Sequence, residues 1–514
     1  MTGAGLVVLL AVLGGPEPEP EDDEGQRSAW DAAGWGAPAE VEPPADAEAE
    51  PPAEAEPPEP AESSEAGWEA AGWGAPESEP SGESQTEAPE PPAAIDAEPG
   101  PEAEPGPAAE PEAEHDKLRV GDVLSGSLRL TGSFLHFDDE PLLYPEGDDG
   151  LAIAVARVLV EADVGSHLHF SFNGFGEFAR SPVAVGLSGS FASAGSTASA
   201  YRTRYLTWKY WESGAIVGQL GVDRAAMRMS FDSVNVDIGR FPITYAVTTM
   251  FTTNDFFAPF SATAVNRIYK PGVDAIRVAA GIGPRASVDV VGVMGYDPNR
   301  DLPSWAHSAV FTRAAIVAGG FQWAALGGKV SQRWVAGGSL QGAAGPLSLR
   351  AEFHVGIPDA EGDGHDRDDR PIYGRVAGGP SMTFAWQNAM ISAEYMFASD
   401  GASSPSGYVD RALARYTDDQ PYLAQHYVAA VFAAEIIPIL RASLTGIVNA
   451  TDGSGLAGVS LIYSVADESD LVLGVFVPWG AGLRGVDPVS GFPELGSELG
   501  LSPLSAYLEA RVFF

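Results

Sequence analysis

The sequence predicts an all-β fold: a closed antiparallel transmembrane β-barrel of about 16 strands (range 14 to 18), preceded by a disordered arm rich in proline, alanine and glutamate. Three observations predict this fold. Apolar and polar residues alternate in many runs of roughly nine to twelve residues. No helical stripe of comparable length competes with these runs. Residues 16–115 contain almost no aliphatic side chain larger than alanine, so they cannot build a core.

The first 15 residues have the pattern of an export signal. Leu6–Leu13 is an uninterrupted apolar run, far short of the ~20 residues that a membrane-spanning helix needs. Gly14 and Gly15 follow it, which predicts a signal peptide over residues 1–15 with cleavage after Gly14. Because Met1–Gly5 contain no Lys or Arg, either the α-amino group supplies the positive charge or the true start lies upstream.

Residues 16–115 form the predicted arm. Residues 1–115 carry 30 Asp plus Glu against the single base Arg27, whereas the rest of the chain carries 41 acids against 28 bases. A segment so charged and so poor in apolar area gains too little from burial to fold. Neither part offers the basic stripe that phosphate contacts need, so nucleic-acid binding is excluded. The chain has no cysteine, which excludes disulfides and thiolate metal sites.

The arm contains a short repeat. It reads WDAAGWGAP over Trp30–Pro38 and WEAAGWGAP over Trp68–Pro76. Tryptophan is costly to leave in water, which favours a pair of docking motifs for a partner. Duplication within low-complexity sequence is the alternative interpretation. The residues that would dock the partner are Trp30, Trp35, Trp68 and Trp73.

Residues 116–514 form the predicted barrel. Leu347–Val355 alternates without a break, and Leu504–Phe514 alternates to the last residue. Soluble sandwiches alternate too, but their strands are about five or six residues long, whereas a tilted membrane-crossing strand needs about nine to eleven. A closed barrel leaves no unsatisfied edge in lipid. Aromatic residues near the strand ends suit an interfacial girdle, namely Tyr205, Trp208, Tyr210, Trp211, Trp386, Tyr395 and Trp479.

In such a barrel the apolar residues face lipid and the charged residues of the opposite parity face the lumen. A barrel of about sixteen strands is too wide for side chains to fill, so it encloses an aqueous passage unless something plugs it. Because both charge signs occur, the lining suits small polar solutes. The expected pore-lining residues are Arg129, Arg157, Glu161, Arg228, Asp232, Arg277, Asp289, Arg350, Glu352, His354, Glu394, Arg441, Glu509 and Arg511.

The chain resembles the porin-like outer-membrane β-barrel proteins of Gram-negative bacteria. Its closing strand ends on Phe514, and DIGR, NDFFAP and KPGVDAIRV over residues 237–278 are similar to a pattern of large porin-like barrels. The resemblance implies a passive channel rather than an enzyme, with no cofactor. It also implies contact with outer-membrane lipid, a terminal aromatic read by the barrel-assembly machinery, and a location in the cell outer membrane with the arm in the periplasm.

Two other functions stay open. The barrel could be a structural anchor whose periplasmic arm docks a partner through the tryptophan repeats. It could also cleave lipids, because His169, Ser171 and Asn173 share one face of the strand SHLHFSFNG and resemble the residues of outer-membrane phospholipases. Phe172 interrupts the motif of those enzymes, and the parity turns the histidines toward water, so simple lumen lining is the favoured interpretation.

Three loops carry specific expectations. The aromatic-rich segment 241–272 is expected to fold into the lumen or over its mouth as a constriction, with packing on the barrel rim as the alternative. The segment 397–427 contains YVDRALARY, which suggests a short helix. The loop PDAEGDGHDRDDR resembles half of a calcium loop through Asp359, Glu361 and Asp363, although Arg370 stands where a bidentate acid is expected. A solvated acidic loop is the alternative there.

Overall fold

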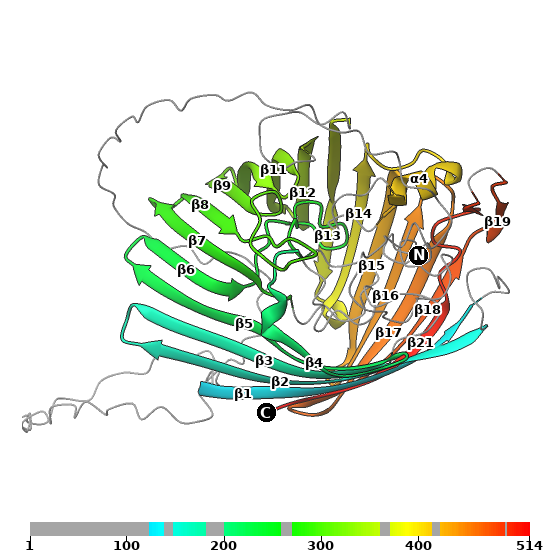
Figure 1. The fold of residues 1–514 in the computed structure, drawn as a ribbon, viewed down its shortest axis with the longest axis horizontal. Helices are drawn as coiled ribbons and strands as arrows, with labels where there is room; N and C mark the ends of the chain where they lie inside the picture. The colour runs from blue at the N-terminus through cyan, green and yellow to red at the C-terminus, as the bar shows by residue number, and fades with distance from the viewer. Residues whose placement is uncertain are drawn as a thin grey trace, which may run out of the picture.

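The computed structural model describes residues 123–137, 147–180, 200–258, 270–359, 371–413, 422–488 and 491–514. Within these residues, 18 antiparallel strands form one closed barrel, which confirms the predicted fold class (Figure 1). Eighteen lies at the top of the expected range and above the best estimate of about sixteen. The predicted signal peptide and arm lie outside the described residues.

The barrel strands follow one another around the wall in chain order. The first nine are β1 (Leu124–His136), β2 (Asp148–Val164), β3 (Leu168–Arg180), β5 (Ile216–Phe231), β6 (Val234–Phe241), β7 (Val273–Ile282), β8 (Ala286–Val293), β9 (Ala309–Ala318) and β10 (Phe321–Val330). The second nine are β11 (Arg333–Ala344), β12 (Leu347–Pro358), β13 (Tyr373–Phe384), β14 (Ala389–Ala398), β15 (His426–Ile437), β16 (Leu440–Asn449), β17 (Gly455–Ala466), β18 (Ser469–Trp479) and β21 (Leu504–Phe513).

The remaining elements are short and lie in the connections. They are η2 (Arg204–Leu206), β4 (Thr207–Ser213), η3 (Trp386–Asn388), η4 (Pro405–Gly407), α4 (Tyr408–Leu413), β19 (Leu483–Val486) and β20 (Pro493–Leu495). The helix α4 confirms the short helix expected in the segment 397–427. None of the described helices is long and apolar enough to cross a membrane.

The two ends of the barrel differ in their connections. At one end, here the short-turn end, tight turns such as 165–167, 232–233 and 467–468 join the strands. The opposite, long-loop end carries the extended connections, among them 242–272, 399–425 and 480–503. The first and last strands, β1 and β21, pair along Ser127–His136 and close the wall. Short turns at one end and long loops at the other are typical of transmembrane β-barrels whose first and last strands begin and end on the same side of the membrane.

The seam between the first and last strands is held by backbone and side-chain bonds. The N–H of Gly126 donates to the carbonyl of Phe514 at 2.7 Å, and the N–H of Phe514 donates back at 3.0 Å. Beside them, Nε of Arg129 donates to the Glu509 carboxylate at 2.7 Å. A seam paired in this way leaves no open sheet edge between these strands, as lipid requires.

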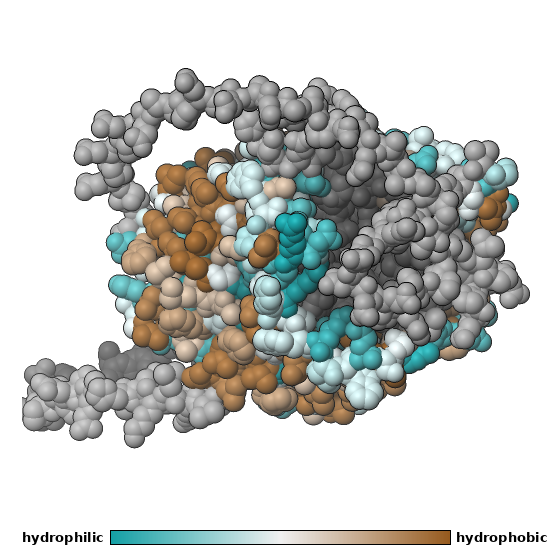
Figure 2. All heavy atoms as spheres, viewed as in Figure 1, coloured by the Kyte–Doolittle hydropathy of each residue, from teal (hydrophilic) through white to brown (hydrophobic). Residues whose placement is uncertain are grey.

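The wall is apolar outside and charged inside. On β12 the side chain of Phe353 is 52% exposed, whereas its neighbour Glu352 is 1% exposed. Figure 2 shows apolar residues gathered over the visible outer wall. In a soluble protein this distribution would be inverted, because water would cover the outer surface. The seven aromatic residues expected in interfacial girdles are all exposed, as are Phe231 and Trp323 near the short turns and Trp305 and Trp334 near the long loops.

Candidate functional site

The loop that leaves β6 runs through the barrel interior instead of staying on the rim. Residues 242–258, here the crossing loop, run from β6 into the barrel (Figure 1). Their backbone N–H groups bond side chains of β12 and β14 on another part of the wall. This placement agrees with the expectation that the segment 241–272 folds into the lumen. The last part of that segment, residues 259–269, lies outside the described residues.

Glu394 on β14 holds the middle of the crossing loop. Its carboxylate accepts hydrogen bonds from the backbone N–H groups of Thr249 and Met250, each at 2.7 Å, and of Phe251 at 3.1 Å. It also accepts the Thr249 hydroxyl at 2.6 Å. Successive N–H groups around one anion form a nest, which stabilises a buried carboxylate without a cation. Glu394 therefore fixes the loop to the wall.

Glu352 on β12 makes a second, similar attachment. It accepts the N–H groups of Val247 at 2.5 Å and Asn254 at 2.9 Å, together with the hydroxyl of Thr253 at 3.1 Å. Asn254 is in turn within 3.2 Å of Nδ1 of His354. Three residues expected to line the pore thus lie on the inner wall, namely Glu352, His354 and Glu394. Their side chains form hydrogen bonds with the crossing loop.

The crossing loop has an apolar side and a small, hydroxylated side. Its aromatic side chains pack on the inner wall, where the rings of Tyr245 and Phe256 lie 5.2 and 5.4 Å from the ring of Phe311. The residues of this loop that stay partly exposed are Pro242, Thr244, Ala246, Thr249, Thr252 and Ala258. Because the aromatic side chains point to the wall, the partly exposed surface of the loop is built mainly from threonine and alanine.

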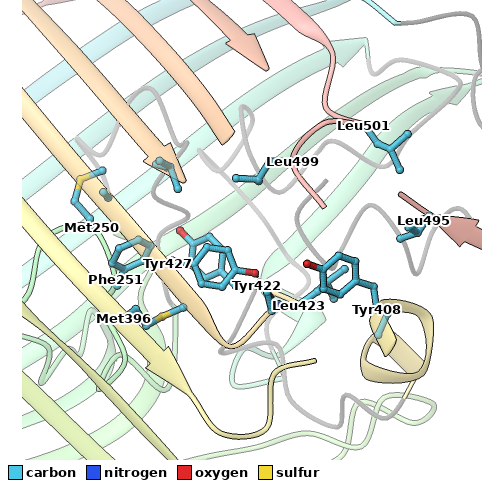
Figure 3. Close-up of a cluster of buried hydrophobic side chains, with 14 of the residues drawn as sticks. Met250, Phe251, Met396, Tyr408, Tyr422, Leu423, Tyr427, Leu495, Leu499 and Leu501 are labelled. Carbon is cyan, nitrogen blue, oxygen red and sulfur yellow. Dashed lines mark hydrogen bonds between the residues drawn. The ribbon is translucent and has the colours of Figure 1, made fainter. Parts of the chain in front are cut away.

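At its tip the crossing loop meets two other long loops. Figure 3 shows Met250 and Phe251 beside Tyr422 and Tyr427, and the rings of Phe251 and Tyr422 lie 5.5 Å apart. We call this packing the mouth cluster. It contains Leu135, Phe137, Met250, Phe251, Ala377, Met396, Tyr408, Ala412, Tyr422, Leu423, Ala424, Tyr427, Ala429, Ile447, Leu495, Leu499 and Leu501. These residues come from strands and loops far apart in the chain, so the cluster braces the long-loop end.

A buried acid lies within the mouth cluster. The Glu498 carboxylate accepts the N–H of Leu423 at 3.0 Å, Nδ2 of Asn449 at 2.9 Å and the hydroxyl of Tyr427. The second carboxylate nearby, Asp452, accepts the Tyr408 hydroxyl at 2.7 Å and the N–H of Glu498 at 2.9 Å. Burial raises the pKa of Glu498 to about 7. The loops at this end are therefore joined through a group that titrates near neutral pH.

Two acids on the inner wall are each shared by two arginines. Asp237 on β6 bonds Arg228 and Arg277, each at 2.7 Å, and Glu509 on β21 bonds Arg129 and Arg511. The Arg228 side chain is 50% exposed and that of Asp237 only 6%. Because Asp237 is covered and Arg228 is half exposed, the charge presented to water at the Asp237 group is positive.

The other expected lining residues occupy varied places. Arg157 bonds Asp223 at 2.8 Å, and Asp289 is 3.8 Å from Arg313. Asp232 lies in the turn after β5 with a positive φ of 42°. The remaining residues of this group are Glu161 on β2, Arg350 on β12 and Arg441 on β16, all on strands of the wall.

Several charged residues of the interior were missed by sequence reasoning. Asp223 and Asp237 hold arginines, and Lys270 pairs with Asp255 of the crossing loop. Asp237 was visible in the DIGR run, but its partners Arg228 and Arg277 belong to other strands. Asp223 lies where the register of β5 shifts against β3, between Asn173 and Gly174, and such a bulge changes which residues face inward.

The structure does not join the residues proposed for lipid cleavage into a catalytic pair. His169 contacts Asp163 through Nδ1 at 2.9 Å, whereas Ser171 lies opposite Ala226 and Glu161 on the neighbouring strands. Of the calcium candidates, Glu361 and Asp363 lie outside the described residues, and Asp359 is buried with its N–H bonded to Gln332 at 2.9 Å. Among the described residues no group of three or more His, Asp or Glu could hold a metal ion.

Comparison with known proteins finds likeness in structure only. No known family and no curated protein matches the sequence. OccAB4 of Acinetobacter baumannii is 8% identical, with 76% of this chain and 97% of that chain covered and a TM-score of 0.45. A BenF-like porin from Pseudomonas fluorescens Pf-5 is 10% identical, with coverage of 76% and 98% and a TM-score of 0.47. OccK2 (OpdF) of Pseudomonas aeruginosa, solved in complex with glucuronate, is 8% identical, with coverage of 76% and 98% and a TM-score of 0.46.

The chain is a closed antiparallel β-barrel, and the solved structures that resemble it are outer-membrane porins of Gram-negative bacteria.

Proposed function

We propose that this protein is an outer-membrane channel through which small polar solutes diffuse passively. The observation that carries the proposal is the inverted wall: an apolar outer surface surrounds an inner surface of arginines, acids and hydroxyls in a barrel of 18 strands. A closed sheet of that size is too wide for its own side chains to fill. The crossing loop, held by Glu352 and Glu394, would narrow the passage.

The same geometry supports an orientation. The described chain starts at β1 and ends after β21 at the short-turn end, which faces the periplasm in bacterial outer-membrane barrels. The acidic arm, residues 16–115, would then extend into the periplasm, after removal of a signal peptide at residues 1–15. Outer-membrane lipid would cover the apolar wall, and the barrel-assembly machinery would recognise Phe514.

At most positions, the residues that line the lumen favour the passage of neutral and anionic solutes over that of cations. The partly exposed arginines Arg228, Arg277 and Arg129 share acids that are more deeply covered. The crossing loop adds threonine hydroxyls without adding an exposed charge. Such a surface favours solutes that accept hydrogen bonds.

Recording from planar bilayers tests the proposal. The purified full chain should need detergent for extraction, migrate differently on gels before and after heating, and produce stable open steps in conductance. A chain that stays dissolved and monodisperse without detergent would contradict both the membrane location and the channel. A barrel that inserts into the bilayer but never conducts would support the membrane location and contradict the channel.

The structural anchor is a second candidate, favoured by the mouth cluster. Packing of the crossing loop against the segments around Tyr422 and Leu499 suits a barrel that is closed at one end. In that case the tryptophan repeats would hold a periplasmic partner and the barrel would be silent in bilayers. Capture of one defined periplasmic protein, lost when Trp30, Trp35, Trp68 and Trp73 are replaced by alanine, would support this function.

A further inference from the structure

Partly exposed arginines lie on one side of the barrel near its short-turn end. Arg228, three residues before the end of β5, has a side chain that is 50% exposed, and Arg277 on β7 is 21% exposed. Their shared acid, Asp237, is only 6% exposed. Arg350, three residues after the start of β12, is partly exposed, and Arg285 in the turn between β7 and β8 is exposed. We call Arg228, Arg277, Arg285 and Arg350 the arginine face.

The other side of the short-turn end is acidic. Glu161 and Asp163 near the end of β2 are exposed, and so are Asp467 and Glu468 in the turn between β17 and β18. In the order of strands around the wall, β17 and β2 lie across the lumen from β7–β12. On the arginine side Asp232, in the turn after β5, is also exposed, so the two sides differ in their balance of charge. An anion at this end is therefore attracted to the arginine face and repelled from the other side.

The described loops inside the barrel attach to the wall no closer to the short-turn end than the arginine face does. Glu352 and Glu394 hold the crossing loop five residues from the short-turn ends of β12 and β14. The mouth cluster lies at the long-loop end. A ligand that arrives from the short-turn end therefore meets the arginine face before it meets the mouth cluster.

The chain supplies a large anion at that end. Residues 16–115 contain 30 Asp and Glu against the single base Arg27, and β1 begins at Leu124, nine residues after this arm. Even a compact coil of 100 residues averages ~55 Å from end to end, which is about the full length of a 17-residue strand such as β2. An arm attached at the short-turn end thus reaches the arginine face.

The tether compensates for the weakness of single contacts. Guanidinium groups bind carboxylates through paired hydrogen bonds, but an exposed ion pair contributes little. Acids recur about every three residues along the arm, so several can contact the arginine face at once. A covalent linker also holds its ligand at an effective concentration of about a millimolar or more, which no separate acidic protein has at this site.

We infer that the acidic arm, residues 16–115, binds the arginine face of its own barrel from the periplasmic side and restricts passage. The inference rests on the proposed channel and deepens it, because it names what regulates the lumen. Bound arm carboxylates would occupy the arginines that favour anionic solutes. Anionic solutes would then compete with the arm, and high salt would release it by screening.

Voltage across a planar bilayer tests this binding. The full chain should close for long periods when the voltage draws anions in from the side of the arm, and it should stay open at the opposite sign. Moving one charge through the whole field changes the equilibrium by about fiftyfold per 100 mV, so the response should be steep. Replacing every Asp and Glu of residues 16–115 with Asn or Gln should shorten the closures by about tenfold or more.

Variants of the wall show where the arm binds. Arg228→Gln combined with Arg277→Gln should shorten the closures by about three- to tenfold, because two weak ion pairs are lost. Arg484→Gln removes an exposed base from β19 at the long-loop end and should leave them unchanged. Closures that keep their natural length with the neutral arm, or with the Arg228 and Arg277 changes, would overturn the inference.

Cross-linking of the detergent-solubilised full chain gives a reading that does not need conductance. Because the chain has no cysteine, a single pair can be introduced. Ser64→Cys in the arm and Ser230→Cys, two residues after Arg228 on the inner face of β5, should be joined within one chain by a short bis-maleimide. Ser64→Cys with Ser464→Cys, beside Asp470 on the acidic side, should be joined about tenfold less.

The two experiments fail separately. If the chain never conducts, the channel fails, yet cross-links within one chain that prefer Ser230→Cys and disappear in high salt still support binding of the arm. If the chain conducts but cross-links form equally at both positions, or join two chains, the channel stands and the inference fails. Absence of any cross-link to Ser230→Cys also rejects it.

Discussion

Glu394 receives two hydrogen bonds from Thr249, one from the backbone N–H at 2.7 Å and one from the hydroxyl at 2.6 Å. The two residues are 145 positions apart in the chain. Their contact joins the wall of β14 to the crossing loop, so a charged residue of the lumen fixes the position of the loop instead of facing the passage. The conductance of the channel should therefore depend on this attachment.

Replacing Glu394 with alanine should loosen the crossing loop. Each hydrogen bond to a charged group contributes about 1.5–3 kcal/mol, and the change leaves the N–H groups of Thr249, Met250 and Phe251 without their acceptor. We expect a larger and noisier open-channel current in planar bilayers. Ser392→Ala, on the same face of β14, is the matched control and should conduct like the natural chain. An unchanged current in Glu394→Ala would show that the loop does not limit passage.

The packing of the long loops should depend on pH through Glu498. Burial raises its pKa from an ordinary 4.5 to about 7, so the packed state holds the proton more tightly than an open state. The loops are then packed most stably below about pH 4.5 and lose roughly 3 kcal/mol as the pH rises through 7. Tyr427, Tyr408 and Asp452 face the same site.

Gating in bilayers at pH 5 and pH 8 measures this dependence. The natural chain should change between closed and open levels more often at pH 8. Glu498→Gln mimics the protonated acid and should behave at both pH values like the natural chain at pH 5. The same pH response in the variant and the natural chain would assign the dependence to other groups.

The barrel seam should weaken when Glu509 is replaced by glutamine. The carboxylate accepts Arg129 at 2.7 Å and the hydroxyl of Thr131 at 2.8 Å, and it also pairs with Arg511. Removing one partner of a buried charge group costs about 3–5 kcal/mol, because the remaining charges stay covered and repel. We expect a lower temperature for the heat-dependent gel shift. Glu435→Gln alters a partly exposed acid on β15, away from the seam, and should keep the natural temperature.

Ion selectivity should respond to Arg228. This side chain is half exposed and shares Asp237 with Arg277, so the group carries a surplus positive charge. In a salt gradient, Arg228→Gln should shift the reversal potential toward cations, and high salt should reduce the difference by screening. A shift toward anions would mean that Arg228 does not face the passage.

The periodicity of the sequence was sufficient to predict the wall. Leu347–Val355 alternates along β12, and the outer exposure of Phe353 and the inner burial of Glu352 follow from that parity. The number of strands was harder to predict from the sequence, because β6 and β8 are only 8 residues long and their apolar–polar alternation is brief. The short strands explain why the best estimate was sixteen and the barrel has eighteen.

The role of each inward-facing residue could not be predicted from the periodicity of the sequence. Glu352 and Glu394 have the parity of lumen residues, but their partners are backbone N–H groups about a hundred or more positions away. A backbone N–H has no sequence signature, so nothing in the pattern indicates that an acid will bind a loop.

The sequence by itself determined the fold class and the inverted distribution of apolar residues, because strand parity and local composition are properties of neighbouring residues. The tertiary structure decided which charged side chains are paired with other groups of the protein and which remain exposed. Hydrogen bonds and ion pairs depend on distances between strands and loops that closure of the barrel brings together, and the bulge between β3 and β5 alone changes which face Asp223 occupies.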